Sequence, residues 1–173
     1  VKQAVRWMPM EKWDKCKVAF NEELLTGRVC YGGLDLSSTT DITAFVLVFP
    51  PTEDDEHYYV LPYFWLPEET LPLRVRRDHV PYDIWERQGY LKTTEGNVVH
   101  YGFIENFIDE LGQKFHIKEI AFDRWGAVQM SQNLEGLGFT MVQFGQGYKD
   151  TSPTLDINAS TCSLFGGYAI SSV

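Results

Sequence analysis

The sequence contains few cysteines and no long apolar run. Its three cysteines, Cys16, Cys30 and Cys162, are an odd number at unrelated spacings, which predicts reduced thiols in a cytosol and no zinc site. No apolar run approaches the roughly 20 residues of a membrane-spanning helix, and the amino terminus lacks the pattern of a signal peptide. These absences argue against a membrane protein and against a secreted protein, and they favour a cytoplasmic one.

Positive charge is also scarce, because 15 Lys and Arg residues face 24 Asp and Glu residues, for a net charge of −9. Proteins that hold nucleic acid by global electrostatics depend on Lys and Arg, so the charge argues against that class. It does not exclude a nuclease, in which metal-binding acids add negative charge locally. No glycine-rich phosphate loop followed by Lys and Ser or Thr occurs, which excludes a P-loop ATPase motor within this sequence.

The length and composition are those of one globular domain. A chain of 173 residues can bury a sizeable core, and 44% hydrophobic with 14% aromatic residues argues against disorder. Because the sequence begins with Val instead of Met, we expect a fragment or a processed chain. We expect a lead-in segment at 1–28, the main domain at 29–153, and a tail at 154–173 whose small and β-branched residues predict no helix.

The stretch 31–49 is the centre of the predicted fold. Apolar residues predict one strand at 29–36 and a second at 42–49, with a hydroxyl-rich turn at 37–40 between them. Asp35 stands near the end of the first strand, where an ionised carboxylate is costly unless it is paired or bound to a cation. Asp35 is therefore a candidate metal ligand; the alternative is an aspartate that caps the turn.

A second strand of the same design supports the metal interpretation. In residues 118–126 an apolar run again ends on an acid, Asp123, and a glycine and a helical pattern follow. If the two strands are neighbours in one sheet, Asp35 and Asp123 lie at the same edge. Hard divalent ions such as Mg²⁺ and Mn²⁺ are held by all-oxygen sites of this kind.

The remaining patterns predict an α/β protein. They indicate a third strand at 58–66, where Pro62 points to an edge strand or a bulge, then an amphipathic helix at 101–115, a strand at 119–123, a helix at 125–137 and a fifth strand at 139–144. The order β-β-β-α-β-α-β is that of a ribonuclease-H-like fold, with a mixed five-stranded sheet flanked by helices. The helix that should follow the last strand is not predicted.

The segment 67–97 has weaker periodicity. A helix at 68–78, interrupted near Pro72, carries the densest basic cluster of the chain, Arg74, Arg76 and Arg77. This cluster is either a solvated face or a contact to a phosphate backbone. The long insertion at 81–96 predicts a functional loop, whose aromatic residues either anchor the loop or stack on a ligand.

Several motifs together resemble the nuclease domain of the large terminase subunit of HK97-like tailed bacteriophages. They are RWMPMEKW at 6–13, GLDLSSTTDITA at 33–44, YFWLP at 63–67, VPYDIW at 80–85 with QGYL at 88–91, IAFDRWG at 120–126 and FGQG at 144–147. They span residues 1 to about 153 in the family's order. The resemblance implies an endonuclease that cuts concatemeric phage or prophage DNA with two divalent ions, Mg²⁺ or Mn²⁺, during genome packaging.

The resemblance also implies site residues. Asp35 and Asp123 match the family's first two catalytic acids, and Asp41 matches a recurrent acid that either binds metal or supports a ligand. The family's third acid lies near its carboxyl terminus, where this sequence departs from the pattern. Asp150 and Asp156 are the only acids left there, and neither stands in a matching motif. Lys149 or Arg124 could neutralise the scissile phosphate, or either could be a surface charge.

The partners implied by the resemblance are double-stranded DNA, an ATPase domain, the small terminase subunit and the portal, in the cytoplasm of the bacterial host. Two other functions remain open. One is a catalytically impaired nuclease fold that docks to the portal or to DNA. The other is a phosphate-binding lobe of the actin-like or sugar-kinase type, because residues 33–40 resemble its first phosphate loop; the second lobe and the later adenosine motif of that class are missing from this sequence.

Overall fold

The computed structural model describes residues 10–16, 20–37, 41–123, 127–144 and 168–170. Its helices are α1 (Met10–Lys15), α2 (Leu71–Asp78), α3 (Tyr82–Arg87), α4 (Tyr101–Lys114) and α5 (Val128–Gly136), with short 3₁₀ turns η1 (Glu22–Leu25) and η2 (Glu68–Thr70). Its strands are β1 (Val29–Asp35), β2 (Thr43–Phe49), β3 (Tyr58–Pro67), β4 (Lys92–Thr94), β5 (His116–Asp123), β6 (Met141–Phe144) and β7 (Tyr168–Ile170). Arg124, Lys149, Asp150, Asp156 and the start of the helix predicted at 125–137 lie outside the described residues.

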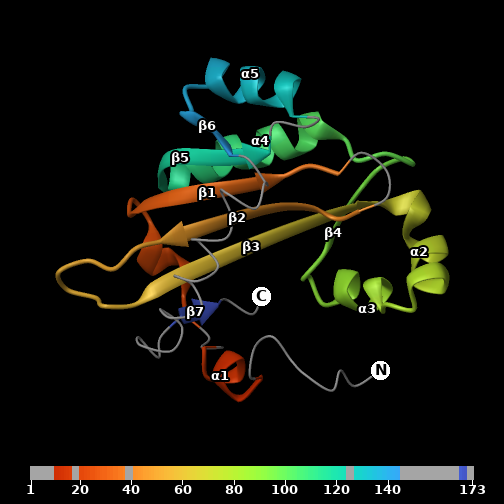
Figure 1. Cartoon of the computed structure of the whole chain (residues 1–173), viewed down its shortest axis with the longest axis horizontal. Helices are drawn as coiled ribbons and strands as arrows, with labels where there is room; N and C mark the ends of the chain where they lie inside the picture. The colour runs from red at the N-terminus through yellow and green to blue at the C-terminus, as the bar shows by residue number, and fades with distance from the viewer. Residues whose placement is uncertain (1–9, 17–19, 38–40, 124–126, 145–167, 171–173) are drawn as a thin grey trace.

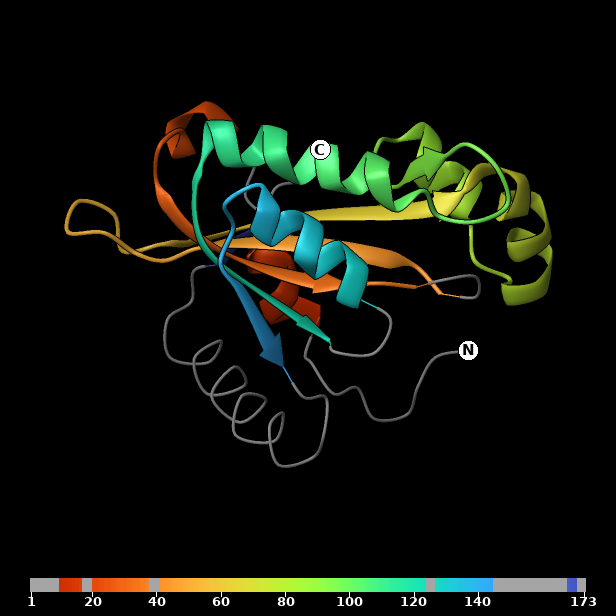
Figure 2. The ribbon, with the colours of Figure 1, turned by 90° about the horizontal axis from the view of Figure 1, so that it is seen from above.

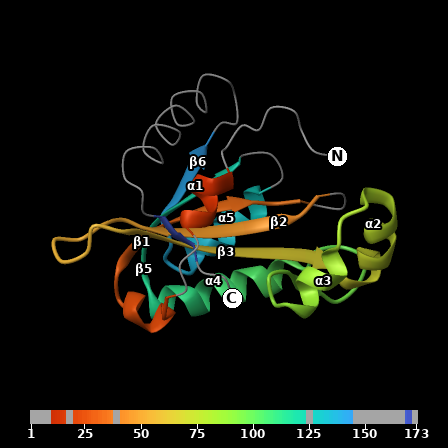
Figure 3. The ribbon, with the colours of Figure 1, turned by 90° about the horizontal axis from the view of Figure 1, so that it is seen from below.

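One mixed sheet organises the molecule (Figure 1). Its strand order is β4-β3-β2-β1-β5-β6, and β7 pairs with β3. Strands β1, β2 and β3 form an antiparallel meander, while β5 is parallel to β1 and β6 is parallel to β5. Helices α4 and α5 cover one side of the sheet, and α1 lies on the other side (Figures 2 and 3). The predicted ribonuclease-H-like α/β fold is confirmed.

The sheet is larger than the five strands predicted from the sequence. Strands β4 and β7 both run parallel to β3, each over three residue pairs. The insertion predicted as a loop at 81–96 contains both α3 and β4. Strand β4, with the sequence Lys-Thr-Thr, has no apolar alternation of its own, so its existence depends on the partner strand and could not be detected locally.

Strand β3 carries the proline at a position that tolerates it. Strand β7 pairs with residues 58–60 of β3 and β4 pairs with residues 65–67. Pro62 falls between these two pairings, so among the described residues β3 has a partner at this point only on the β2 side. Proline has no backbone N–H to donate to a neighbouring strand, so it is tolerated where one side of a strand is unpaired. The edge predicted from Pro62 is therefore confirmed locally.

The main core lies between the sheet and helices α4 and α5. Alternate residues of β2 are buried, and they meet the apolar stripe of α4, formed by Ile104, Ile108 and Leu111. Gly32 of β1 allows close packing here, because a Cβ at this position would lie 3.0 Å from the Phe45 ring and 3.1 Å from Ile120. Within the described part of the chain, no helix is long and apolar enough to cross a membrane.

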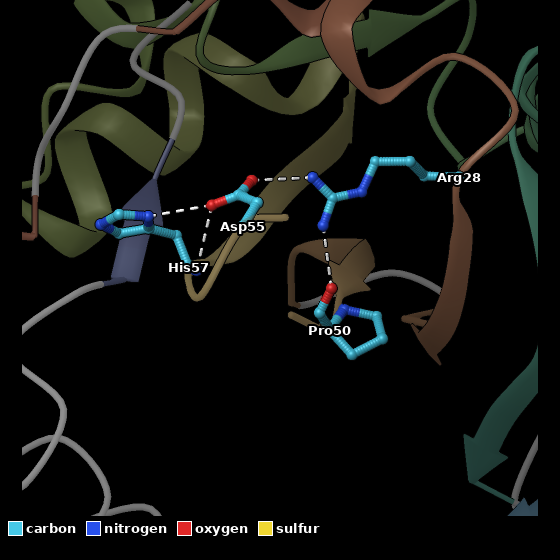
Figure 4. Close-up of polar contacts among 4 residues, drawn as sticks. All are labelled: Arg28, Pro50, Asp55 and His57. Carbon is cyan, nitrogen blue, oxygen red and sulfur yellow. Dashed lines mark hydrogen bonds and ion pairs between the residues drawn. The ribbon is translucent and has the colours of Figure 1, made fainter. Parts of the chain in front are cut away.

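A polar cluster fixes the end of the sheet where β1 begins (Figure 4). The Arg28 guanidinium donates to the Asp55 carboxylate at 3.0 Å and to the carbonyl of Pro50 at 2.9 Å, and the His57 ring lies 2.9 Å from Asp55. Burial would raise the pKa of Asp55, but hydrogen bonds from His57, Tyr59 and Arg28 hold it well below its ordinary range. These hydrogen bonds tie the loop between β2 and β3 to the start of β1.

Candidate functional site

The two carboxylates predicted from the strand ends lie at one edge of the sheet. Asp35 is the last residue of β1 and Asp123 is the last residue of β5. The two strands are parallel neighbours with Leu34 opposite Phe122, so the next position along each strand brings Asp35 beside Asp123. Leu34 and Phe122 are buried, whereas Asp35 is exposed and Asp123 half-buried. Both acids therefore belong to the sheet face that is turned away from the main core.

An open cavity of about 270 Å³ lies beside these acids. Its lining includes Asp35, Asp123 and Phe144 together with the small residues Gly33, Ala44 and Ala121. A Cβ added to Gly33 would meet no atom within 4 Å. Small side chains on this face leave room for a ligand next to the carboxylates.

Asp41, the third predicted acid, joins the same electrostatic environment. Partial burial raises the pKa of Asp35, and the negative charges of Asp123 and Asp41 raise it further. Each cause disfavours the ionised form of Asp35. Acidic side chains that lie close together and repel one another attract cations, and such clusters are typical of functional sites.

The donor chemistry fits a hard divalent cation, but the described ligand set is small. Paired carboxylates are the ligands that Mg²⁺ and Mn²⁺ prefer. In the part of the chain that the structure describes, no three His, Cys, Asp or Glu side chains come together as a set that could hold a metal ion. Asp35 and Asp123 thus form a carboxylate pair, and Asp41 acts on Asp35 through its charge.

A hydroxyl network next to the acids was not predicted from the sequence. The Thr43 hydroxyl accepts a hydrogen bond from the Ser37 backbone N–H at 3.1 Å and donates to the Ser37 carbonyl at 3.3 Å. The Ser37 hydroxyl in turn accepts from the backbone N–H of Asp41 at 2.8 Å, and the Tyr101 hydroxyl donates to the Ser37 carbonyl at 3.5 Å. These bonds close the turn between β1 and β2 and fix the backbone of Asp41.

The sequence signal for this network is only two hydroxyl residues, Ser37 at the start of the predicted turn and Thr43 within the second predicted strand. Thr43 is fully buried and Ser37 is 9% exposed, so their bonds are shielded from water. A buried hydrogen bond is costly to break because the group left behind stays unsatisfied. Ser37 and Thr43 are therefore structural supports for the edge that carries the acids.

Comparisons with known proteins agree with this geometry. The family described as "Terminase large subunit, endonuclease domain" matches residues 2–160. The large terminase subunit of Enterobacteria phage HK97 is 42% identical over 147 residues, which cover 83% of this chain and 28% of that protein. The crystal structure of the HK97 bacteriophage large terminase matches with a TM-score of 0.79 at 36% identity and covers 94% of this chain and 33% of its own. The chain thus spans about a third or less of the length of these relatives.

Proposed function

The chain belongs to the family of terminase large subunit endonuclease domains, and from this premise we propose that it is a metal-dependent endodeoxyribonuclease that cuts concatemeric phage DNA during packaging. The observation that carries the proposal is the pair of carboxylates at the ends of two adjacent parallel strands. Negative charge is concentrated there beside an open cavity. Such a place can bind cations and admit a phosphodiester.

We assign Asp35 and Asp123 as the residues that would hold the metal ions, and Asp41 as a further ligand or an orienting group. Bound Mg²⁺ or Mn²⁺ ions supply activation of water and stabilisation of the leaving 3′ oxygen. The protein holds the two carboxylates at the ends of paired strands, and partial burial together with the neighbouring negative charges raises the pKa of Asp35. A cation relieves that repulsion, so metal binding and the placement of the acids reinforce one another.

The wider assembly is part of the proposal. We propose that residues 1–28 link to an ATPase domain, that residues 29–153 form the nuclease domain, and that residues 154–173 form a divergent tail. The chain spans only 28% of the HK97 large subunit, which leaves room in such a protein for the motor. The implied partners are double-stranded DNA, the small terminase subunit and the portal, in the cytoplasm of the bacterial host.

A second candidate is a nuclease fold with impaired catalysis that docks to the portal or to DNA. It is supported by the described residues, which provide two carboxylates and no third ligand in one set. The phosphate-binding lobe of an actin-like or sugar-kinase protein has no comparable support, because the endonuclease family covers residues 2–160. Metal-dependent cleavage separates the two remaining candidates.

The experiment is a nicking assay with supercoiled plasmid and the purified chain. We expect conversion to open-circular and linear DNA with Mn²⁺ or Mg²⁺, and no conversion when EDTA replaces the metal. Far-UV circular dichroism shows that the protein assayed is folded. A folded chain that cleaves nothing with either metal contradicts the nuclease proposal and leaves the impaired docking module.

A second expected result concerns the hydroxyl network. Thr43→Val keeps the shape of the side chain but removes the acceptor of the buried Ser37 N–H. We expect the Mn²⁺ concentration for half-maximal nicking to rise about 10-fold, which is typical of groups that orient metal ligands. We also expect the free energy of unfolding to fall by about 1–3 kcal/mol, the usual cost of leaving a buried donor without a hydrogen-bond partner.

The matched control for Thr43 is Thr94→Val. Thr94 is likewise a buried strand threonine whose hydroxyl accepts from a backbone N–H, that of His100 at 3.4 Å, but it takes no part in the turn that carries Asp41. Thr94→Val should leave the metal requirement unchanged. Equal metal titrations for the two variants would show that the Thr43 network has only a general structural role.

A further inference from the structure

Helix α2 concentrates positive charge in an acidic protein. Three of its eight residues are arginines, Arg74, Arg76 and Arg77, and Asp78 is its only acid. The whole chain has a net charge of −9. A DNA substrate is a polyanion, so it meets net repulsion unless local positive charge faces it.

The arginines of α2 divide between the two sides of the helix. Arg74 is 4% exposed and points inward, whereas Arg76 and Arg77 are exposed. The Arg76 Nε donates to the Pro72 carbonyl at 3.3 Å, and Arg77 donates to the Asp78 carboxylate at 2.6 and 3.1 Å. Even with this ion pair, the Arg77 side chain remains 58% exposed. Two guanidinium groups therefore face solvent from the last turn of α2.

This surface lies toward the end of the sheet where β2 begins. In all three views α2 lies at the end of the sheet where β2 begins (Figures 1–3). Trp65, near the end of β3 that leads to α2, pairs with Thr43 at the start of β2. Hydrogen bonding to Asp78 is the main reason that the pKa of Arg77 is raised, and the charge of Asp41 contributes to the same shift. The positive end of α2 is thus within electrostatic reach of Asp41, one of the predicted site residues.

We propose that Arg76 and Arg77 bind backbone phosphates of the DNA strand that enters the carboxylate site and so position the scissile bond. This inference rests on the proposed nuclease function. The planar guanidinium fork matches two phosphate oxygens, and phosphate contacts fix the register of a protein on DNA without reading its sequence. Arginines in the last turn also stabilise the helix through their favourable interaction with its dipole, so the test must separate DNA binding from helix stability.

The test uses the full chain and the double variant Arg76→Gln/Arg77→Gln. Binding to a fluorescent DNA duplex of about 25 base pairs is followed by anisotropy in EDTA, where no cleavage occurs, over a series of salt concentrations. We expect affinity at low salt to fall about 10-fold or more, and the slope of log K against log salt to decrease by about 2, one unit for each lost phosphate contact. With Mn²⁺, the KM for cleavage should rise more than kcat falls.

Arg87→Gln is the matched control. Arg87 lies in the last turn of the neighbouring helix α3, its side chain is 68% exposed, and it also pairs with an aspartate on its own helix, Asp83. This variant should retain the affinity and the salt slope of the parent. Thermal unfolding of both variants monitors any loss of helix stability.

The outcomes separate this inference from the proposed function. If the parent binds DNA but does not cleave, and the double variant loses binding, the nuclease proposal fails while the phosphate contact is supported. Unchanged binding and KM in the double variant would overturn the inference, as would an equal loss in Arg87→Gln. A parent that binds no DNA also overturns it, and α2 would then be a surface for another protein or for solvent alone.

Discussion

Asp35→Asn and Asp123→Asn are each expected to reduce metal-dependent nicking by about a thousandfold or more. Each change removes a charged oxygen ligand from the pair that is held at the ends of β1 and β5. Loss of metal-centred activation removes several kcal/mol of transition-state stabilisation, and about 1.4 kcal/mol corresponds to each factor of ten in rate. Initial rates of plasmid nicking, measured across a range of Mn²⁺ concentrations, give the effect. Asp41→Asn should cost less, about 10- to 100-fold, if Asp41 only orients the site.

Glu119→Gln is the matched control for the two aspartates. Glu119 is an exposed acid on β5, and it stands on the same face of the strand as Asp123 but opposite Tyr31 instead of at the strand end. Its substitution removes the same charge from the same strand without touching the edge. Nicking that falls as far in Glu119→Gln as in Asp123→Asn, or that survives in either asparagine variant, would contradict the assignment.

Stability gives an independent check that the Asp35 variant is folded. The pKa of Asp35 is raised in the folded protein by burial and by Asp123 and Asp41. The folded state therefore holds the proton more tightly than the unfolded chain, and stability is lost as pH rises through the folded-state pKa. In EDTA, Asp35→Asn should unfold at a slightly higher temperature than the parent at pH 7. The difference should vanish at pH 3, below the ordinary aspartate pKa.

The sequence predicts those elements of the fold that carry an apolar pattern of their own, and it misses those that do not. The meander β1–β3 and helix α4 have strong local periodicity, and they were predicted within one or two residues at nearly every end. Strand β5 begins three residues earlier than predicted, because its first residues, including His116 and Lys118, are polar or exposed. Strand β4 and helix α3 were missed because their pairing with β3 and packing on α2 are tertiary effects.

The candidate site shows the same division. An acid that ends an apolar strand is a local feature, so Asp35 and Asp123 could be singled out in advance. The hydroxyl network joins Tyr101 to Ser37 across 64 residues and exists only in the folded chain. The sequence also did not show which arginines of α2 are buried and which are exposed, because the predicted break near Pro72 left the register of the helix undefined. The predicted interruption near Pro72 is confirmed, because the segment divides into η2 and α2 just before this proline. Pro72 lies in the first turn of α2, where its missing N–H costs little.

Trp65→Ala is expected to give the largest loss of stability, about 3–5 kcal/mol, the usual range for truncating a fully buried aromatic residue. Trp65 is completely buried in β3, and its ring meets that of Phe107 on α4 edge to face, with centroids 5.3 Å apart. It therefore joins the sheet to the helix that covers it. Urea unfolding followed by circular dichroism measures the effect, and Trp85→Ala, a half-exposed tryptophan on α3, should cost less than about 1 kcal/mol.

Trp65→Phe distinguishes ring packing from polarity. The buried Nε1 of Trp65 has no hydrogen-bond partner among the described residues, and an unsatisfied buried donor is unfavourable. Phenylalanine removes that donor and keeps most of the ring, so we expect a loss of no more than about 1.5 kcal/mol. Equal losses for the phenylalanine and alanine variants would mean that the indole N–H is satisfied in solution. Because Trp65 stands opposite Thr43 in the sheet, the alanine variant should also loosen the turn that holds Asp41, and its metal requirement for nicking should rise.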